Sequence, residues 1–231
     1  MNEAIVLAGG FGTRLRSVVS DVPKPMAPVA GRPFLEYLLD SLKRQGYTHV
    51  VLSTGYMHEK IEGHFGHEYN SIAIDYAREE TPLGTGGAMV NALQHCSSEC
   101  VTVLNGDTMF CIDHKQFINQ SAKNGSRLSI VTRLVDDAGR YGMVESDNAT
   151  GRITAFREKD PTIGSGYING GIYRLHRSLL DPYPLGTTFS FEKEVMQPLR
   201  EPFYAYASDG YFIDIGVPDD YLRAQTELPA L

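Results

Sequence analysis

The feature that most constrains the fold is the start of the chain, where the apolar run AIVLA at residues 4–8 leads directly into the glycines of LAGGFGTRL. An unbroken apolar run of this kind is typical of a strand buried on both faces of a parallel sheet. Glycines at the carboxyl end of such a strand let a phosphate reach backbone N–H groups without hindrance from Cβ atoms. We therefore expect an open α/β sheet that binds a phosphate-bearing ligand at this edge.

Strand and helix signals alternate along the first half of the chain. The expected strands are 50–52, 72–76 and 101–104, and the expected helices are 33–45, 59–65 and one that runs from TPLGTGGA to about residue 94. Beyond residue 125 the pattern changes to closely spaced strands, near 126–133, 142–145, 152–158 and 167–173. The sequence predicts an α/β, Rossmann-like fold with a mostly parallel central sheet flanked by helices and a mixed, β-rich extension.

The composition excludes several classes of function. The chain has 231 residues, of which 42% are hydrophobic, and can bury the core of one large α/β domain. Its net charge of −7, without a basic stripe, argues against a nucleic-acid partner. No apolar run approaches the ~20 residues of a membrane span, and no secretory signal precedes the first strand. We expect a cytoplasmic protein without a membrane partner, whose three cysteines form no disulfide framework.

The order GGFGTR fits neither of two common phosphate-binding motifs. The motif G-x-G-x-x-G would need glycine where Leu15 stands, and the Walker A motif would need Gly-Lys-Ser/Thr at residues 11–13. A nicotinamide-dependent oxidoreductase and a P-loop ATPase are therefore disfavoured. Arg14, Arg16 and Lys24 supply local positive charge for a polyanionic ligand. The simplest alternative is a glycine-rich turn that carries exposed arginines.

Lys24 lies between two prolines, Pro23 and Pro25. Because each proline pushes the preceding residue toward extended geometry, we expect Lys24 outside a helix, on a stiff stem that suits contact with a phosphate. The alternative is a solvated lysine in a proline turn. As an exposed residue, Lys24 is expected to affect stability by no more than ~0.5 kcal/mol when it is replaced by alanine.

Two aspartates are candidate metal ligands. Asp107 follows the strand 101–104 in NGDT, and Asp214 lies in the apolar segment YFIDIG ahead of a helix start at Pro218. A carboxylate at the carboxyl end of a strand suits Mg²⁺ held against phosphates, and a carboxylate among apolar residues is costly unless it meets a cation or donors. The alternatives are a helix cap or a turn.

A last group of polar residues follows in the second half. Glu158, Lys159 and Asn169 carry groups that suit sugar hydroxyls and a phosphate monoester, and Gly142 leaves room for a ring. Read alone, however, these residues are better explained by a solvated strand end and a hairpin turn. SFEKE at 190–194 is typical of a helix that begins at a capping serine.

The motifs LAGGFGTRL, PKPM, ETPLGTGGA, NGDT, FREK and FIDIG, in this order, resemble those of the sugar-1-phosphate nucleotidyltransferase family across essentially the whole chain. YINGGIYRL, FSFEKEV and YFIDIGVPDDY further resemble the D-glycero-D-manno-heptose 1-phosphate guanylyltransferases within it. The resemblance implies a GT-A-like single domain, 1–231, with a mainly nucleotide-binding half, 1–125, and a mainly sugar-phosphate-binding half, 126–231. It also implies transfer of a nucleoside monophosphate to a sugar 1-phosphate, with release of pyrophosphate and without a side-chain nucleophile.

The resemblance assigns three sets of residues. The nucleotide would be bound by Leu7, Ala8, Gly9, Gly10, Gly12, Thr13, Arg14, Lys24, Glu80, Pro82, Gly84 and Thr85, with Arg14 and Lys24 as the catalytic residues. The sugar phosphate would be bound by Asn105, Gly106, Gly142, Glu158, Lys159 and Asn169, and the resemblance also implies a role near the sugar site for SFEKE at 190–194. The cofactor would be Mg²⁺, held by Asp107 and Asp214.

The choice of base has a partial physical basis. Guanine presents two N–H donors on one edge, and a carboxylate such as Glu80 or Glu79 can accept both, whereas uracil presents one. GTP is therefore the first candidate and UTP the second, and a homo-oligomer is compatible with the resemblance. A non-catalytic nucleotide-binding regulatory subunit is the remaining alternative, and it is disfavoured because Arg14, Lys24 and both aspartates are present.

Overall fold

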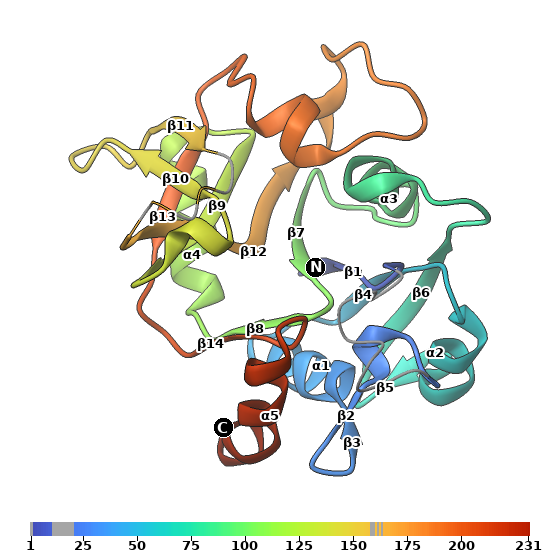
Figure 1. The fold of residues 1–231 in the computed structure, drawn as a ribbon. Helices are drawn as coiled ribbons and strands as arrows, with labels where there is room; N and C mark the ends of the chain where they lie inside the picture. Colours follow the sequence, from blue (N-terminus) through green and yellow to red (C-terminus); the bar gives the residue numbers. More distant parts are fainter. Residues whose placement is uncertain (1, 11–20, 158–159, 161, 163) are drawn as a thin grey trace.

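The computed structural model describes residues 2–10, 21–157, 160, 162 and 164–231 (Figure 1). The candidate site residues that lie outside this part of the chain are Gly12, Thr13, Arg14, Glu158 and Lys159. Within it, no helix is long and apolar enough to cross a membrane.

The main sheet of the described chain has eight strands in the order β13-β9-β12-β7-β1-β4-β6-β5. They span Glu3–Leu7 (β1), His49–Thr54 (β4), Glu68–Tyr69 (β5), Ile72–Arg78 (β6), Cys100–Asn105 (β7), Leu128–Val135 (β9), Gly166–His176 (β12) and Tyr204–Ala207 (β13). Strands β7, β1, β4 and β6 are parallel, as are β9 and β13, whereas β12 runs antiparallel to both neighbours and β5 to β6. The mostly parallel central sheet predicted from the sequence is confirmed.

Five α-helices accompany the sheet in the described residues. They span Phe34–Arg44 (α1), His58–Phe65 (α2), Gly84–Leu93 (α3), His114–Asn124 (α4) and Pro218–Glu227 (α5). Short 3₁₀-helices span Lys24–Met26, Ala138–Arg140, Arg177–Leu180 and Leu228–Ala230, and a π-helix spans Glu192–Met196. The helices predicted near α1, α2 and α3 are confirmed, whereas α4 was not predicted. Asp113 caps α4, because its side chain accepts a hydrogen bond of 2.9 Å from the Gln116 N–H.

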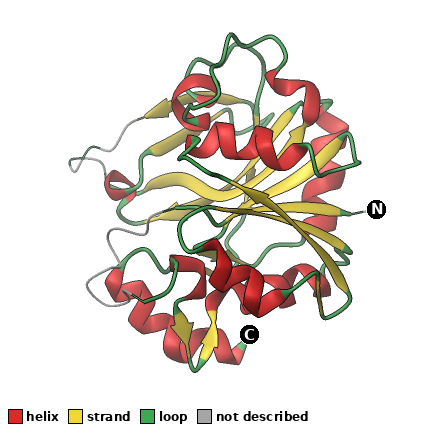
Figure 2. Cartoon of the chain, turned by 90° about the vertical axis from the view of Figure 1, so that its right-hand side faces the viewer, coloured by secondary structure: helices red, strands yellow, loops and turns green. Residues whose placement is uncertain are grey.

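Side-chain alternation along the central strands divides the core into two layers. Val6 and its β4 neighbour Leu52 are buried with α1, α2 and α5 on one face of the sheet. Ile5 and its β4 neighbour Val51 are buried with α3 and the π-helix on the other. Figure 2 shows helices on both sides of the sheet. Burial on both faces is the reason why these strands are unbroken apolar runs.

The β-rich second half is largely a continuation of the main sheet rather than a separate layer. Strands β9, β12 and β13 extend the sheet beside β7. The smaller pairs join Met143–Ser146 (β10) to Ile153–Arg157 (β11), Thr108–Phe110 (β8) to Phe212–Asp214 (β14) and Pro28–Val29 (β2) to Arg32–Pro33 (β3). The pairing of β8 with β14 brings the neighbourhood of Asp107 to that of Asp214.

A buried carboxylate fixes the amino end of β1. The side chain of Glu3, only 2% exposed, accepts hydrogen bonds from the Ser97 N–H and hydroxyl at 3.1 Å and from the Ser98 N–H at 2.5 Å. His49 Nδ1 lies 3.0 Å from the same carboxylate. Burial acts to raise the pKa of Glu3, but these hydrogen bonds outweigh it and lower the pKa from 4.5 to about 2.

Glu3→Gln is expected to lower the free energy of unfolding by about 1–3 kcal/mol at pH 7, because an amide cannot accept all of these hydrogen bonds. Since the pKa of Glu3 is lower in the folded protein, its contribution is complete above pH 4.5 and is lost as the pH falls toward 2. Urea denaturation of both proteins across this range measures the difference. A difference that is the same at pH 7 and at pH 3 would contradict a role for the ionised carboxylate.

Candidate active site

The carboxyl ends of β1, β4 and β7 meet at one edge of the sheet. The Ala8 N–H donates to the Ser53 carbonyl at 2.8 Å, and the Gly106 N–H donates to the Leu7 carbonyl at 3.0 Å. These bonds hold the segment after β7 against the first glycines of the chain. Gly9 and Gly10 therefore lie beside Asp107, as the parallel topology requires.

A cavity of about 340 Å³ opens at this edge. Its walls come from β1, the β6–α3 connection, β7 and the π-helix, and they comprise Leu7, Gly9, Gly10, Glu79, Pro82, Gly84, Thr85, Ala88, Asn105, Asp107 and Glu192. Most of the described residues predicted to bind the nucleotide are among them. Ala8 lies one residue away and is buried, and Asn105, which was predicted on the sugar side, lines this cavity instead.

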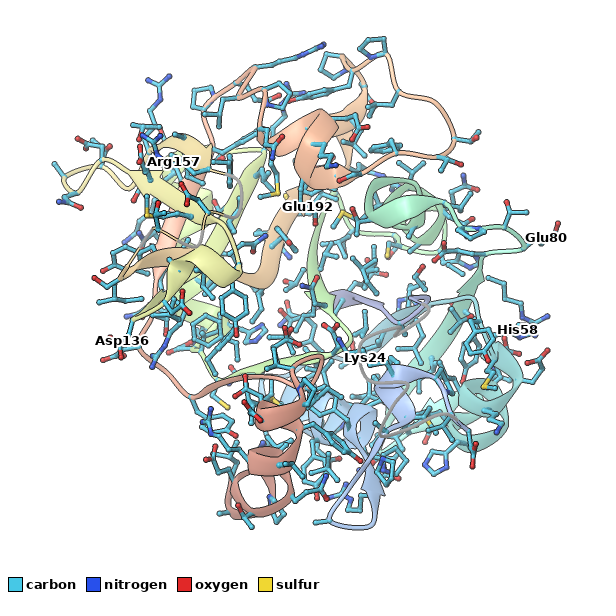
Figure 3. The ribbon with its side chains drawn as sticks, in the orientation of Figure 1. Lys24, His58, Glu80, Asp136, Arg157 and Glu192 are labelled. Carbon is cyan, nitrogen blue, oxygen red and sulfur yellow. The ribbon has the colours of Figure 1, made fainter. Side chains whose placement is uncertain are left out.

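Glu79 rather than Glu80 faces this cavity. The Glu79 N–H donates to the Thr54 carbonyl at 2.8 Å, so the chain continues in register with β4 and turns this side chain inward against Gly9. Its carboxylate accepts hydrogen bonds from the Ser53 hydroxyl at 3.2 Å and from the Leu83 N–H at 3.0 Å. Glu80 is exposed at the outer edge of the molecule (Figure 3). Alternation along the extended chain is the physical reason for this difference from the sequence-based expectation.

Lys24 lies between the two predicted metal ligands (Figure 3 labels Lys24). Its Nζ atom is 2.5 Å from Asp107 Oδ2 and 3.7 Å from Asp214 Oδ1. The side chains of Lys24, Asp107 and Asp214 are 16%, 33% and 21% exposed, so water screens their charges less than on an open surface. Two carboxylates that face one cation also fit Mg²⁺, which proteins bind through one or two carboxylates together with phosphate and water oxygens.

The backbone around Lys24 differs from the expected extended stem. Lys24 begins a 3₁₀-helix, in which the Met26 N–H donates to the Pro23 carbonyl at 2.7 Å and the Ala27 N–H to the Lys24 carbonyl at 3.0 Å. Prolines can take part in this turn because it needs their carbonyl groups and not their missing N–H groups. Gly216 makes room for the ammonium group, since a Cβ atom there would lie 2.0 Å from Lys24 Nζ.

Burial and the nearby charge of Asp107 raise the pKa of Asp214, against the opposing attraction of Lys24. The Gly216 N–H also donates to Asp214 Oδ1 at 2.7 Å. The raised pKa means that burial and the charge of Asp107 together disfavour the ionised form of Asp214 even with the lysine in place. Additional positive charge would therefore be stabilised at this point.

A second cavity of about 280 Å³ lies beside the first. It is lined by Tyr141, Gly142, Met143, Val144, Phe156, Arg157, Asn169, Ser190, Glu192, Lys193, Met196 and Gln197. Gly142 and Asn169, which were predicted to bind the sugar phosphate, are among these residues. The Asn169 amide donates to the Tyr173 hydroxyl at 2.7 Å, and its oxygen accepts from the Gly171 N–H at 3.0 Å, which fixes the orientation of the side chain.

Glu192 lines both cavities. The resemblance implied a role near the sugar site for its segment, SFEKE, but assigned no role to this residue. SFEKE does begin a helix at a capping serine, as predicted, because the Ser190 hydroxyl accepts a hydrogen bond of 3.3 Å from the Lys193 N–H. The same segment also supplies side chains to the cavities. The helix-start pattern of SFEKE does not by itself indicate that the segment also lines two cavities.

The chain is similar to known proteins in sequence and in fold. A family model described as nucleotidyl transferase matches residues 3–230. D-glycero-alpha-D-manno-heptose 1-phosphate guanylyltransferase of Aneurinibacillus thermoaerophilus is 44% identical over 228 residues, 98% of each chain. The enzyme of the same name from Campylobacter jejuni is 42% identical and covers 95% of this chain and 96% of its own.

Among solved structures, HddC from Yersinia pseudotuberculosis complexed with GMP-PN has a TM-score of 0.87 at 38% identity, over 97% of this chain and 98% of its own. A putative glucose-1-phosphate thymidylyltransferase from Bacillus anthracis has a TM-score of 0.84 at 20% identity, over 100% of this chain and 96% of its own, and this likeness concerns the fold alone.

Lys24→Met is expected to lower the free energy of unfolding of the metal-free protein by about 1–2 kcal/mol, because it leaves two partly buried carboxylates without their cation. The sequence led us to expect a nearly neutral substitution of an exposed lysine, whereas the Lys24 side chain is only 16% exposed and contacts both carboxylates. Thermal and urea denaturation in the presence of a chelator measure the effect, and Lys115→Met, at an exposed lysine of α4, is the matched control.

Adding Asp214→Asn to Lys24→Met is expected to recover part of the loss at pH 7, since it removes one of the two repelling charges. A Lys24→Met protein that unfolds like the parent would show that the lysine does not stabilise the carboxylate pair.

Proposed function

The chain belongs to the nucleotidyl transferase family, and from this premise we propose that it transfers GMP from GTP to D-glycero-D-manno-heptose 1-phosphate. The products would be the GDP-sugar and pyrophosphate. The observation that carries the proposal is the position of the Lys24–Asp107–Asp214 cluster. Asp107 lines the first cavity, and this cavity shares the Glu192 side chain with the second cavity. A reaction between two bound phosphates needs this arrangement of two cavities and a charged centre. Two similar proteins are named as guanylyltransferases for this sugar phosphate, and each matches almost the whole chain, which supports the choice of both substrates.

In the proposed reaction the protein supplies position and charge rather than a nucleophile. A phosphate oxygen of the sugar 1-phosphate would attack the α-phosphorus of GTP in line. The bond from this phosphorus to the bridging oxygen would break, and pyrophosphate would leave with the electron pair. Preorganised positive charge is the main source of rate in such transfers. Lys24 would contact the α-phosphate, and Arg14, on sequence evidence alone, the triphosphate.

Asp107 and Asp214 are the residues that would hold Mg²⁺. Both offer carboxylate oxygens to the position where Lys24 Nζ lies. When bound, Mg²⁺ would neutralise negative charge on the phosphates. The carboxylates would then have a cation of their own, and Lys24 would be free to contact a phosphate.

Glu79 is the residue that we propose for guanine recognition. Its carboxylate lies in the wall of the first cavity and already accepts hydrogen bonds from Ser53 and Leu83. A carboxylate offers about four acceptor sites, so it can also take the N1–H and N2–H groups of guanine. Uracil would use one such site, which leaves a UTP-dependent hexose or amino-sugar 1-phosphate transferase as the second candidate.

The second cavity is the proposed sugar-phosphate site, with Gly142 and Asn169 in its wall and Glu158 and Lys159 as candidates from the sequence. This assignment corresponds to a mainly nucleotide-binding half, 1–125, and a mainly sugar-phosphate-binding half, 126–231. The π-helix crosses this division, since Glu192 also lines the nucleotide cavity.

Pyrophosphate release from four nucleoside triphosphates, each paired with several sugar 1-phosphates, tests the proposal. GTP with the manno-configured heptose 1-phosphate is expected to give the highest kcat/KM. Glu79→Gln is expected to reduce kcat/KM for GTP by about 10- to 100-fold, the cost of losing a hydrogen bond to a charged acceptor. The matched control is Glu80→Gln, which changes the exposed neighbour. The proposal fails if GTP with this sugar is no better than the other pairs, and the role of Glu79 fails if both variants behave alike.

A further inference from the structure

The two cavities share one side chain, and this side chain is bonded to the nucleotide-side wall. Glu192 comes from the π-helix of the second half of the chain and lies between that half and α3 (Figure 3). Its Oε2 atom accepts a hydrogen bond of 2.7 Å from the hydroxyl of Thr85, in the first turn of α3. Thr85 is itself part of the first cavity wall. A residue that would contact the sugar is thus held by a residue that would contact the nucleotide.

The Thr85 hydroxyl takes part in a second hydrogen bond. It accepts a hydrogen bond of 2.9 Å from the Phe191 N–H, and it donates its own proton to Glu192. The Ser190 hydroxyl donates to the same Oε2 atom at 3.0 Å. Two donors on one oxygen leave the carboxylate with acceptor capacity for a ligand hydroxyl, because an ionised carboxylate offers about four acceptor sites.

Backbone hydrogen bonds also join the start of α3 to the segment that precedes the π-helix. The Phe189 N–H donates to the Leu83 carbonyl and the Gly86 N–H donates to the Phe189 carbonyl, both at 3.0 Å. A Cβ atom at Gly86 would lie 2.0 Å from the Phe189 ring, so the two segments are in close contact. Packed interfaces of this kind transmit a displacement of one side to the other instead of absorbing it.

The start of the π-helix has hydrogen bonds of its own besides those that involve Glu192. Glu194, in the same π-helix, accepts a hydrogen bond of 3.0 Å from the Ser190 N–H, and the Ser190 hydroxyl accepts from the Lys193 N–H. These bonds cap the helix without the Glu192–Thr85 contact. The bond between Glu192 and Thr85 therefore joins two segments that are 107 residues apart and is not part of local helix capping.

We propose that the Thr85–Glu192 hydrogen bond couples the two cavities, so that occupation of the sugar cavity strengthens binding in the nucleotide cavity. A sugar hydroxyl that donates to Glu192 would fix this side chain in its bonded position. Thr85 and the α3 turn would then already be ordered when the nucleotide binds, and less conformational entropy would be lost. Coupling is reciprocal, so the nucleotide must favour the sugar phosphate by the same factor. The inference rests on the proposed function, and Thr85 and Glu192 act in it as positioning residues.

The test is a titration by calorimetry with Mg²⁺ and a GTP analogue whose α,β-methylene group cannot release pyrophosphate. Affinity is measured without and with saturating D-glycero-D-manno-heptose 1-phosphate. We expect the sugar phosphate to tighten analogue binding by about 5- to 10-fold in the parent protein, a typical coupling. Thr85→Val is expected to reduce this ratio to below about 2-fold, and Thr85→Ser, which keeps the hydroxyl, is expected to restore it.

Further variants separate the coupling from folding defects. Glu192→Ala is expected to lose the coupling as Thr85→Val does, and the double variant to lose no more than either. Glu194→Gln, which changes a carboxylate two residues away that lines neither cavity, is expected to keep it. A parent protein that turns over GTP with this sugar but shows no coupling, or a Thr85→Val protein that keeps the parental ratio, overturns the inference alone. Absence of turnover with every pair in the panel would instead overturn the proposed function.

Discussion

The candidate site depends on the contact of the Lys24 ammonium group with Asp107 and Asp214. These residues come from the beginning, the middle and the end of the chain. The antiparallel pairing of β8 with β14 brings the two aspartates together, and the Lys24 ammonium group contacts both. The Ile215 N–H also donates to the Asp107 carbonyl at 3.0 Å. Two like charges at one site are stabilised by a cation between them or by protonation of one of them. The attraction between Lys24 and the two carboxylates therefore stabilises this part of the fold, and the same charges would serve phosphate chemistry.

The sheet explains why one cavity adjoins Asp107 and why a second cavity lies next to the first. The parallel strands β7, β1 and β4 end at one edge, and the loops that follow them carry the glycines, Asn105 and Asp107. Strand β12 runs antiparallel beside β7 and brings Asn169 to the neighbouring cavity. The π-helix with Glu192 closes the space between the two cavities. Two phosphate-bearing substrates bound here would be held next to the same positive and negative charges, which is what a transfer between them requires.

The elements with strong apolar patterns could be predicted from the sequence, and those without could not. The strands around Ile5 and Val51 are buried on both faces and appear as unbroken apolar runs. Helix α4, HKQFINQSAKN, buries His114, Phe117 and Ser121, and only one of these three is strongly apolar, so the sequence offers little apolar pattern to detect. The sequence left Glu79 and Glu80 as alternatives and gave SFEKE only a general role near the sugar site, because the placement of Glu79 and of Glu192 depends on strand register and on contacts across many residues. Local patterns carry no information about such contacts.

The central claim is that Asp107 and Asp214 share one divalent ion in the nucleotide complex and that Lys24 then contacts a phosphate. A crystal structure with Mn²⁺, the α,β-methylene GTP analogue and the sugar 1-phosphate tests it most directly, because manganese is located by its anomalous scattering. The account predicts a manganese peak with both carboxylates as direct ligands and Lys24 Nζ within hydrogen-bond distance of a phosphate oxygen. Manganese bound away from either carboxylate, or a lysine that still lies between the two, would contradict it.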